Sequence, residues 1–446
     1  MGHFKGLVLV AGAALSVTGT AAFAQSNDEV KATVAQMLND AETRSSLLAG
    51  GDAGHDGRFF IAGDGFRLNI GGLLQFRYDL NFRDKNNVGS SADDFTHGFQ
   101  TRRIKVDLNG ELNKDWFFRV RLANENGHVT SSSGSAVGTV PGINFDYAYA
   151  GYKFANGWKA TWGQFKLPLL REELVSDSKQ LAAERSLVNG LFTQGYSQGF
   201  EMAYEAETWR GFFAFSDGLN SANTDFNTRQ NINPGGNVSL AVSGQAEYAF
   251  TGRVEFMLSG NWKQFEDFTS AKGSDFGFML GAAAHYQQSD NTGISTDTDL
   301  QTFRYTVDAS LEGDSWNLYA AFIGDHSKAR KAGATGPDYD DFGVVVQGGW
   351  RFAENTEVFA RYEGLFLDKD LVGSGNKKNF NFVTAGLNQY YAGHAAKATL
   401  DAVWSINNTS TLSSAAGGAL PNTGVGLLGQ NKSGEVVVRL QFQVMF

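Results

Sequence analysis

The chain has 446 residues, among them 54 Gly, 5 Pro and no Cys, and it carries a formal net charge of −10. Compared with average usage of ~7% Gly and ~5% Pro, glycine is enriched and proline is depleted, which excludes collagen-like and proline-rich disordered chains. The absence of cysteine excludes disulfide scaffolds, thiolate zinc sites and cysteine nucleophiles. The mean hydropathy of −0.27 fits a soluble chain, and it equally fits strands with one polar and one apolar face.

Residues 1–24 are predicted to be a secretory signal peptide. Lys5 precedes an apolar run that ends at Val17, and the small-residue triplet of residues 22–24 stands directly before Gln25. This run is shorter than the ~20 apolar residues that a membrane-spanning helix needs. Without the signal the charge is −11, since one lysine is removed. No later segment resembles a membrane helix, so a membrane crossing would have to use strands.

Residues 25–65 are predicted to be a periplasmic helix followed by a linker. Apolar side chains recur at helical spacing over residues 26–48, acidic residues stand near the start of this stretch, and Gly50-Gly51 follows its end. The alternatives are a small oligomer-forming coil and a mostly disordered leader, because three turns of moderate periodicity are marginal alone. Residues 49–65 are expected to be the linker.

From Phe66 the hydrophobic period changes from 3.6 to 2. Residues 66–82 alternate strictly between apolar and polar positions, and the same pattern ends the chain over residues 435–446. An average strand has ~5–6 residues, whereas a tilted strand of a membrane barrel needs ~9–11. Comparable segments lie at 98–110, 115–125, 144–154, 157–166, 198–207, 209–217, 238–264, 275–287, 300–312, 315–326, 340–352, 356–367, 380–391 and 394–407.

The connections between these segments fall into two lengths. The short ones lie at 111–114, 155–157, around 208, 313–314, 353–355 and 392–393. The long polar ones lie at 83–97, 126–143, 167–197, 218–237, 288–299, 327–339, 368–379 and 408–433. Short turns on one side and long loops on the other are typical of outer-membrane barrels. Tryptophans beside the short turns predict an interfacial aromatic girdle, formed by Trp116, Trp158, Trp209, Trp316 and Trp350.

The fold predicted for residues 66–446 is an all-β, transmembrane, antiparallel barrel of sixteen strands. Residues 238–264 keep one alternation phase across Thr251-Gly252, which favours a single long or bulged strand over a hairpin. Counting that segment once gives an even number of strands. Eighteen strands would follow if residues 265–299 held a further pair.

The loop of residues 167–197 differs from the other long loops because it carries apolar anchors, such as Leu169, Leu170 and Phe192. A loop of this composition is expected to pack against protein. We expect it to fold into the barrel as a constriction, with docking against a neighbouring subunit as the alternative. Its cations are candidate site residues: Arg171, Lys179 and Arg185.

If the apolar positions of the strands face lipid, the alternate positions face the lumen. Residues 66–166 hold 13 Lys and Arg against 9 Asp and Glu, although the chain as a whole is acidic. A basic pore wall raises the local concentration of anions. The alternative is that these cations pair across strands with Asp79, Asp107, Glu125 and Asp146. The candidate pore-lining and anion-binding residues are Arg77, Arg103, Lys105, Arg119, Arg121, Lys153 and Lys159.

Several runs of sequence resemble the phosphate-selective porin O/P family. They are Thr101 to Leu112 (TRRIKVDLNGEL), Trp116 to Arg121, Gly163 to Pro168 and Glu184-Arg185-Ser186. The resemblance extends from about Gly65 to Phe446. It implies a homotrimeric, sixteen-stranded porin of the outer membrane, with an inward-folded third loop and a basic pathway for inorganic phosphate or other small anions.

In that family, arginines and lysines on the wall and at the constriction guide and bind phosphate. The residues that match by position are Arg103, Lys105, Arg119, Arg121 and Arg185. The third loop also holds Glu172, Glu173, Asp177 and Glu184, so a general, non-selective porin is an alternative. The terminal Phe446 resembles the signal that the barrel-assembly machinery reads.

No catalytic, metal or cofactor site is predicted. The histidines are scattered without metal-ligand spacing, the glycine-rich stretches lack Walker spacing, and the net charge disfavours nucleic acid. A Ser-His dyad, such as Ser310 and His285, would require two residues that the sequence does not bring together. The channel interpretation therefore competes mainly with a plugged structural or adhesive barrel whose long loops contact partners.

Overall fold

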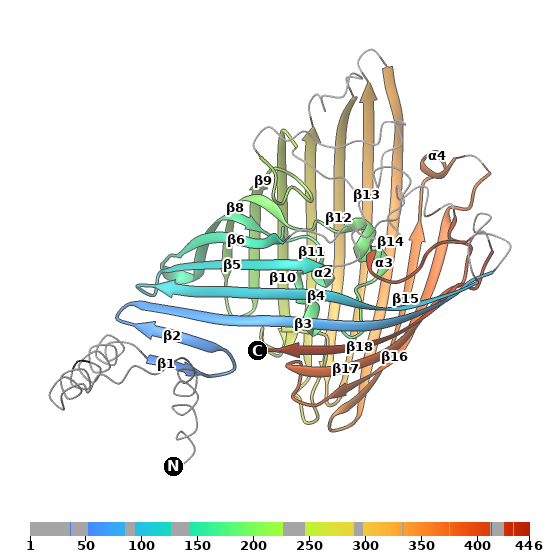
Figure 1. Ribbon diagram of the computed structural model, residues 1–446. Helices are drawn as coiled ribbons and strands as arrows, with labels where there is room; N and C mark the ends of the chain where they lie inside the picture. Colours follow the sequence, from blue (N-terminus) through green and yellow to red (C-terminus); the bar gives the residue numbers. More distant parts are fainter. Residues whose placement is uncertain are drawn as a thin grey trace, which may run out of the picture. The chain divides into compact units, whose positions relative to one another are not determined.

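The computed structural model describes residues 52–84, 94–125, 143–225, 246–289, 298–331, 334–373, 375–410, 423–430 and 432–446, together with residues 36 and 412 (Figure 1). The predicted signal peptide (1–24) lies outside the described residues, as does the predicted helix (26–48) apart from Gln36. Of the helices in the described part, none is long and apolar enough to cross a membrane.

Sixteen of the described strands, β3 to β18, form one antiparallel sheet that closes on itself. Each strand pairs with the next, and β18 pairs with β3 from Val436 opposite Phe82 to Met445 opposite Leu73. The predicted all-β barrel of sixteen strands is confirmed. The strands are β3 (Phe66–Phe82), β4 (Phe95–Leu112), β5 (Trp116–Glu125), β6 (Asn144–Lys153), β7 (Trp158–Phe165), β8 (Ser197–Glu205), β9 (Trp209–Ser216), β10 (Tyr248–Ser259), β11 (Gly277–Ser289), β12 (Thr298–Gly313), β13 (Trp316–Lys331), β14 (Ala334–Ala353), β15 (Thr356–Phe366), β16 (Asn379–Tyr390), β17 (Ala396–Ser405) and β18 (Val436–Met445).

The alternation of the sequence becomes the two faces of the wall. On β3 the outward Phe76 is 48% exposed, whereas its neighbours Gln75 and Arg77 are buried inside the barrel. The five predicted girdle tryptophans lie beside the short turns with exposed rings, and Trp158 and Trp209 both pack against Tyr204. An apolar outer face and a polar inner face fit a barrel with lipid outside and water inside.

Two predicted segment bounds are wrong. The segment 238–264 forms one strand across Thr251-Gly252, but β10 ends at Ser259 because Gly260 (φ +91°) turns the chain into a 3-10 helix, Gln264–Glu266. Residues 238–245 lie outside the described part. The predicted long loop 327–339 is mostly strand, since β13 and β14 continue past the other strands with cross-strand ion pairs, Lys328 to Asp338 and His326 to Asp340.

A short hairpin precedes the barrel within the segment for which the sequence predicts a linker. It consists of β1 (Asp52–His55) and β2 (Phe59–Gly63), and β2 pairs with the first residues of β3, from Phe59 opposite Ile70 to Gly63 opposite Phe66. Figure 1 shows this hairpin beside β3, near the end of the barrel that carries the short turns. The apolar alternation of β2 is only five residues long, so it is a weak sequence signal.

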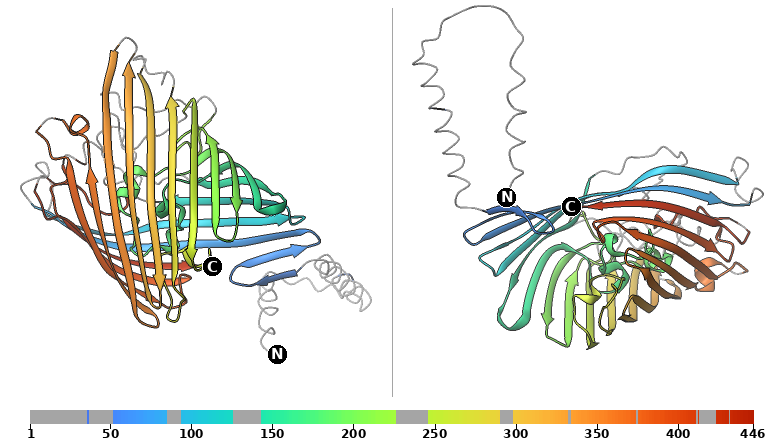
Figure 2. Two further views of the ribbon diagram at one scale, coloured as in Figure 1. Left: turned by 180° about the vertical axis from the view of Figure 1, so that it is seen from behind. Right: turned by 90° about the horizontal axis from the view of Figure 1, so that it is seen from below.

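Loops fill part of the barrel interior. The inward loop, residues 166–196, connects β7 to β8 and contains α2 (Arg171–Leu174), a 3-10 helix (Asp177–Lys179) and α3 (Leu187–Phe192). In Figures 1 and 2 its helices lie inside the ring of strands. Its apolar side chains form a core with residues from α4 (Lys369–Val372), from the segment 423–430 and from the wall, including Leu187, Phe192, Leu371, Phe380, Val403, Val425 and Leu427. This packing fixes the inward loop against β14 to β18.

Candidate functional site

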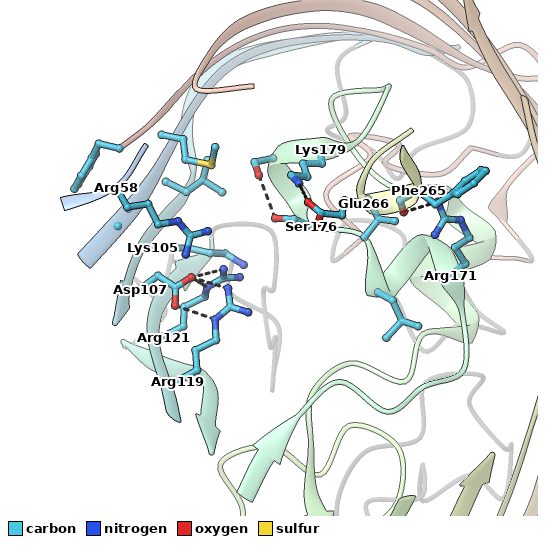
Figure 3. A pocket seen from close by; sticks show the side chains of 18 of the residues that line it. Arg58, Lys105, Asp107, Arg119, Arg121, Arg171, Ser176, Lys179, Phe265 and Glu266 are labelled. Carbon is cyan, nitrogen blue, oxygen red and sulfur yellow. Dashed lines mark hydrogen bonds and ion pairs between the residues drawn. The ribbon is translucent and has the colours of Figure 1, made fainter. Parts of the chain in front are cut away.

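A cavity of about 350 Å³ lies between the inward loop and the wall of β3 to β5. Figure 3 shows cationic side chains on the wall facing residues of the inward loop and of the β10–β11 turn, residues 260–276. Seven Lys and Arg side chains line the cavity, against three acidic side chains, Asp107, Glu255 and Glu266, and the terminal residue Phe446. The cations are Arg58, Lys105, Arg119, Arg121, Arg171, Lys179 and Arg210. The lining therefore has an excess of positive charge.

Two arginines on β5 share one carboxylate on β4. The strand register places Asp107 opposite Arg121, with Arg119 two residues further along the same face. Nε and Nη2 of Arg119 donate to the two Asp107 oxygens at 2.9 and 2.6 Å, and the same atoms of Arg121 donate to Oδ2 at 3.2 and 2.7 Å. The three side chains carry a net charge of +1, and Nη1 of each arginine lies outside the contact with Asp107.

The ring of Tyr147 supports both guanidinium groups. Its centre lies 4.3 Å from Cζ of Arg119 and 5.1 Å from Cζ of Arg121. An aromatic face stabilises a cation and stacks against its plane. The two side chains remain 23% and 13% exposed to the cavity. The arrangement presents two held but accessible guanidinium groups, a geometry that suits a small oxyanion.

Three other predicted cations are buried and tie the inward loop to the wall. Lys105 contacts Asp177 at 2.6 Å and Asp146 at 2.7 Å. Arg103 contacts Glu184 and donates from Nε to Glu125 at 3.3 Å. Arg77 donates to Glu184 at 2.8 Å and to two backbone carbonyls, one in the inward loop and one in the segment 423–430. The pairs of Lys105 with Asp146 and of Arg103 with Glu125 are the cross-strand pairs of the alternative interpretation, and Arg119 and Arg121 pair with Asp107 in the same way. The pairs with Asp177 and Glu184 of the inward loop belong to neither interpretation.

Arg102 is a buried cation that the alternation does not predict. It lies at a β-bulge, because Gln75 on β3 pairs with Arg103 while the next residue, Phe76, pairs with Thr101. The extra residue turns both arginines inward, and Arg102 donates to Glu184 at 2.7 Å. A strict alternation would place Arg102 in lipid at a cost of ~2–4 kcal/mol, so two adjacent arginines in a barrel strand could have indicated the bulge.

Cations hold two carboxylates of the inward loop, Glu184 and Asp177, ionised despite burial, whereas burial raises the pKa of Glu172 from its ordinary value. Burial alone would raise the pKa of Glu184, but Arg102, Arg103 and Arg77 outweigh it and hold the pKa well below its usual value. For Asp177, burial also opposes ionisation, and Arg185, Lys105 and Arg103 together keep its pKa well below the ordinary value. These carboxylates therefore act as charged anchors of the loop.

This charge pattern predicts how the inward loop responds to acid. A carboxylate whose pKa is lower in the folded state stabilises the fold above its unfolded pKa, ~4, and loses that contribution as the pH falls towards the folded value. We expect the difference in unfolding temperature between the unmodified chain and Glu184→Gln to be constant from pH 8 to about pH 5, and to shrink only below about pH 4. A difference that already shrinks between pH 7 and 5 would contradict the ionised anchor.

Lys153 and Lys159 line a second cavity of about 480 Å³ near the short turns. They are 36% and 43% exposed; Lys153 pairs closely with Glu111 at 2.5 Å, and Lys159 lies 4.0 Å from Glu205. The five cations that line this cavity, against one carboxylate, are Arg58, Arg67, Arg119, Lys153 and Lys159. Because Arg58 and Arg119 also line the first cavity, the two cavities are neighbours along the same wall.

The three predicted cations of the inward loop lie in different surroundings. Arg171 donates to Ser310 Oγ and to the Phe265 carbonyl, each at 2.8 Å, and burial lowers its pKa from the ordinary value. Lys179 pairs with Glu266 at 3.0 Å, and Arg185 pairs with Asp177. The β10–β11 turn thus contacts the inward loop from the short-turn side, a contact that the sequence does not predict.

The candidate Ser-His dyad is not formed. Ser310 lies opposite Met279 on β11, six residues from His285, which is about 20 Å along a strand. The His285 ring instead contacts Thr251 at 2.7 Å and Gln287 at 3.0 Å. In the part of the chain that the structure describes, no group of three or more His, Asp or Glu side chains is placed to hold a metal ion.

Comparison with known proteins agrees with this architecture. A family model described as phosphate-selective porin O and P matches residues 70–419. An uncharacterised protein of Aquifex aeolicus (strain VF5) is 24% identical over 339 residues, which cover 73% of this chain and 79% of that protein.

Among solved structures, the barrel is similar in fold to three outer-membrane proteins. They are Salmonella typhi OmpF in complex with daunomycin (TM-score 0.53, 14% identity, 87% of this chain and 100% of that chain), the outer membrane channel DcaP of Acinetobacter baumannii (0.53, 12%, 85% and 98%) and an anion-selective porin from Comamonas acidovorans (0.52, 12%, 85% and 100%). The family model covers most of the chain, and the closed sixteen-stranded barrel of this chain is similar in fold to these three structures. The chain is therefore an outer-membrane β-barrel channel that belongs to the phosphate-selective porin O and P family.

Proposed function

We propose that this porin is a passive diffusion channel that prefers small anions and accepts inorganic phosphate beside Arg119 and Arg121. The observation that carries the proposal is the cavity between wall and inward loop, where seven cations face three acidic side chains. An excess of fixed positive charge in a narrow, low-dielectric passage raises the anion concentration and lowers the barrier to anion passage. The anion-selective porin with a similar fold is consistent with this function.

The chemistry of the site favours an oxyanion over a simple halide. Guanidinium groups present planar, paired N–H donors that match the oxygens of phosphate or carboxylate. The cavity of about 350 Å³ has room for one such anion with part of its water shell, since a water molecule occupies ~30 Å³ of liquid. Asp107 already accepts hydrogen bonds from both arginines, so fewer N–H donors remain for the anion. We therefore expect anion binding to be weak enough for release.

A planar-bilayer experiment tests this function. We expect a reversal potential in a KCl gradient that indicates Cl⁻ preference, and a decrease of the chloride current when inorganic phosphate is added. Cation preference would contradict the anion channel. If the channel prefers Cl⁻ but added inorganic phosphate does not decrease the chloride current, the channel has no phosphate site, and the general porin is supported instead.

A plugged barrel is the second candidate, and the apolar core inside the barrel is the observation that favours it. Leu187, Phe192 and Val425 belong to this core, which occupies the lumen beside β14 to β18. Liposome swelling with small sugars separates the two candidates, because a plugged barrel produces no swelling. Swelling at a rate that depends on sugar size would support the channel.

We propose a homotrimer, on the basis of the family, and recognition of the terminal Phe446 by the barrel-assembly machinery. The backbone of Phe446 extends the β18–β3 pairing through hydrogen bonds with Gly72 at 2.9 and 3.2 Å, and its ring is 43% exposed. An exposed aromatic end of the last strand is consistent with a recognition signal.

A further inference from the structure

The turn of the β1–β2 hairpin, residues 56–58, reaches the inner face of the barrel wall. Pairing of β2 with β3 places Phe59 opposite Ile70, so the turn lies next to the middle of β3. Arg67 on β3 fastens the turn by donating to Asp56 at 2.6 Å, and its guanidinium covers the Phe60 ring at 4.2 Å. The hairpin is therefore held at a defined place on the wall.

Gly71 opens the path for one side chain of this turn. A Cβ atom at Gly71 would lie 3.8 Å from Cδ of Arg58 and 3.0 Å from the carbonyl oxygen of Phe446. Gly71 also pairs with Asp107 on β4. The Arg58 side chain thus lies over Gly71, a position of β3 that has no side chain. Asp107, the carboxylate that Arg119 and Arg121 share, lies on the next strand opposite Gly71.

Among the cations that line the first cavity, Arg58 is exposed and has no ion pair within 4.0 Å in the described part of the chain, whereas Arg171, which also has none there, is buried. Arg58 lines both cavities together with Arg119, and Figure 3 shows it on the same wall as Lys105, Arg119 and Arg121. A terminal oxygen of Phe446 lies near the same side of Gly71, but no ion pair within 4.0 Å to a described residue holds the Arg58 guanidinium, so it is accessible to a passing anion.

We propose that Arg58 is a specificity-determining residue of the pore, a third guanidinium of the anion site that the N-terminal hairpin supplies from outside the sixteen-stranded barrel. This inference rests on the proposed anion preference. The three arginines surround the space beside Asp107 from two sides, Arg119 and Arg121 from β5 and Arg58 across Gly71. An oxyanion there is held by donors from the hairpin and from the wall, so the hairpin is part of the selectivity filter.

Cysteine chemistry tests this role, because the chain has no cysteine and Arg58→Cys introduces a single thiol. The thiol is modified in the bilayer with a cationic trimethylammonium-ethyl or an anionic sulfonato-ethyl methanethiosulfonate. The matched control is Lys272→Cys, which removes one cation from an exposed position of the β10–β11 turn. We expect Arg58→Cys to lower the Cl⁻ to K⁺ permeability ratio by up to about ten-fold at low salt, because one unit charge about 6 Å away in water changes the local concentrations of Cl⁻ and K⁺ about three-fold in opposite directions. The cationic reagent should restore the ratio, and the anionic reagent should lower it further.

The outcomes separate the inference from the proposed function. If the unmodified chain prefers anions but Arg58→Cys and Lys272→Cys behave alike with both reagents, Arg58 is not on the path and the inference fails. If the unmodified chain has no anion preference, the proposed function fails. In that case opposite shifts of the permeability ratio by the two reagents at position 58 still place Arg58 on the path, and equal shifts exclude it.

Discussion

Replacement of both Arg119 and Arg121 by alanine is expected to lower the anion preference of the channel strongly. The two arginines and Asp107 together carry a charge of +1, and the double substitution leaves the Asp107 carboxylate alone with a charge of −1. A unit charge about 6 Å from an ion in water changes its energy by about 0.7 kcal/mol, or its local concentration about three-fold. The change of two units therefore alters each local concentration about ten-fold, in opposite directions for Cl⁻ and K⁺, which corresponds to up to about a hundred-fold in the permeability ratio at low salt.

A charge series makes this prediction sharper than one variant does. Arg119→Ala or Arg121→Ala alone brings the group to zero, and Asp107→Asn raises it to +2. The reversal potential in a KCl gradient is expected to follow the order of these charges, with Asp107→Asn the most anion-preferring. Lys272→Ala serves as a matched loss of one cation on an exposed turn and should leave the reversal potential unchanged.

Two results would contradict the role of this group. The first is a reversal potential that stays constant across the series, which would mean that the permeating ions pass elsewhere. The second is an equal effect of the double variant and Lys272→Ala, which would indicate that only the total charge of the protein matters. Unchanged heat-resistant migration of every variant on gels would show that the barrel still assembles.

Most of the wall could be predicted from the sequence, because each strand position repeats the same choice between lipid and lumen. Residues 66–82 carry that alternation without interruption and form β3 with the same bounds. The same parity predicts that Lys105, Asp107, Arg119 and Arg121 face the interior, where the structure places them. A period-2 pattern contains this information locally, so no tertiary contact is needed to read it.

The remainder of the site depends on contacts between segments that are distant in sequence. Arg102 faces inward because of a bulge, and Arg58 reaches the lumen because Gly71 leaves a gap in a neighbouring strand. Arg77 and Arg103 are polar lumen positions in the sequence, but they are buried because the inward loop brings Glu184 onto them. The net charge of a segment does not say which of its cations an acidic loop will cover.

Glu184→Gln is expected to release the inward loop, with the largest effect on stability of any single substitution in this region. Glu184 contacts Arg77 at 2.8 Å and Arg102 at 2.7 Å, and it also contacts Arg103. All four side chains are almost completely buried. Removal of one partner from a buried ion pair costs about 3–5 kcal/mol, because the remaining charge is left without compensation.

The measurement is the temperature at which the folded barrel loses its compact migration on a gel, together with the open-channel current. We expect Glu184→Gln to lower that temperature and to increase the current noise, because the inward loop, which borders the cavity, loses its charged contacts with the arginines of β3 and β4. The matched control is Glu205→Gln, which removes a carboxylate of the same size from an exposed pair with Lys159 at 4.0 Å. An exposed pair contributes ~0–1 kcal/mol, so this control should change neither property.

The arginines around Glu184 make the prediction specific to charge. A combined Glu184→Gln and Arg102→Gln variant removes one acid and one base, so fewer uncompensated cations remain than in Glu184→Gln alone. We expect this pair to recover part of the lost stability, because the energetic cost lies in buried cations without a partner and not in the shape of the side chain. If Glu184→Gln is as stable as Glu205→Gln, or if the second substitution adds a further loss of full size, the carboxylate does not anchor the inward loop by its charge.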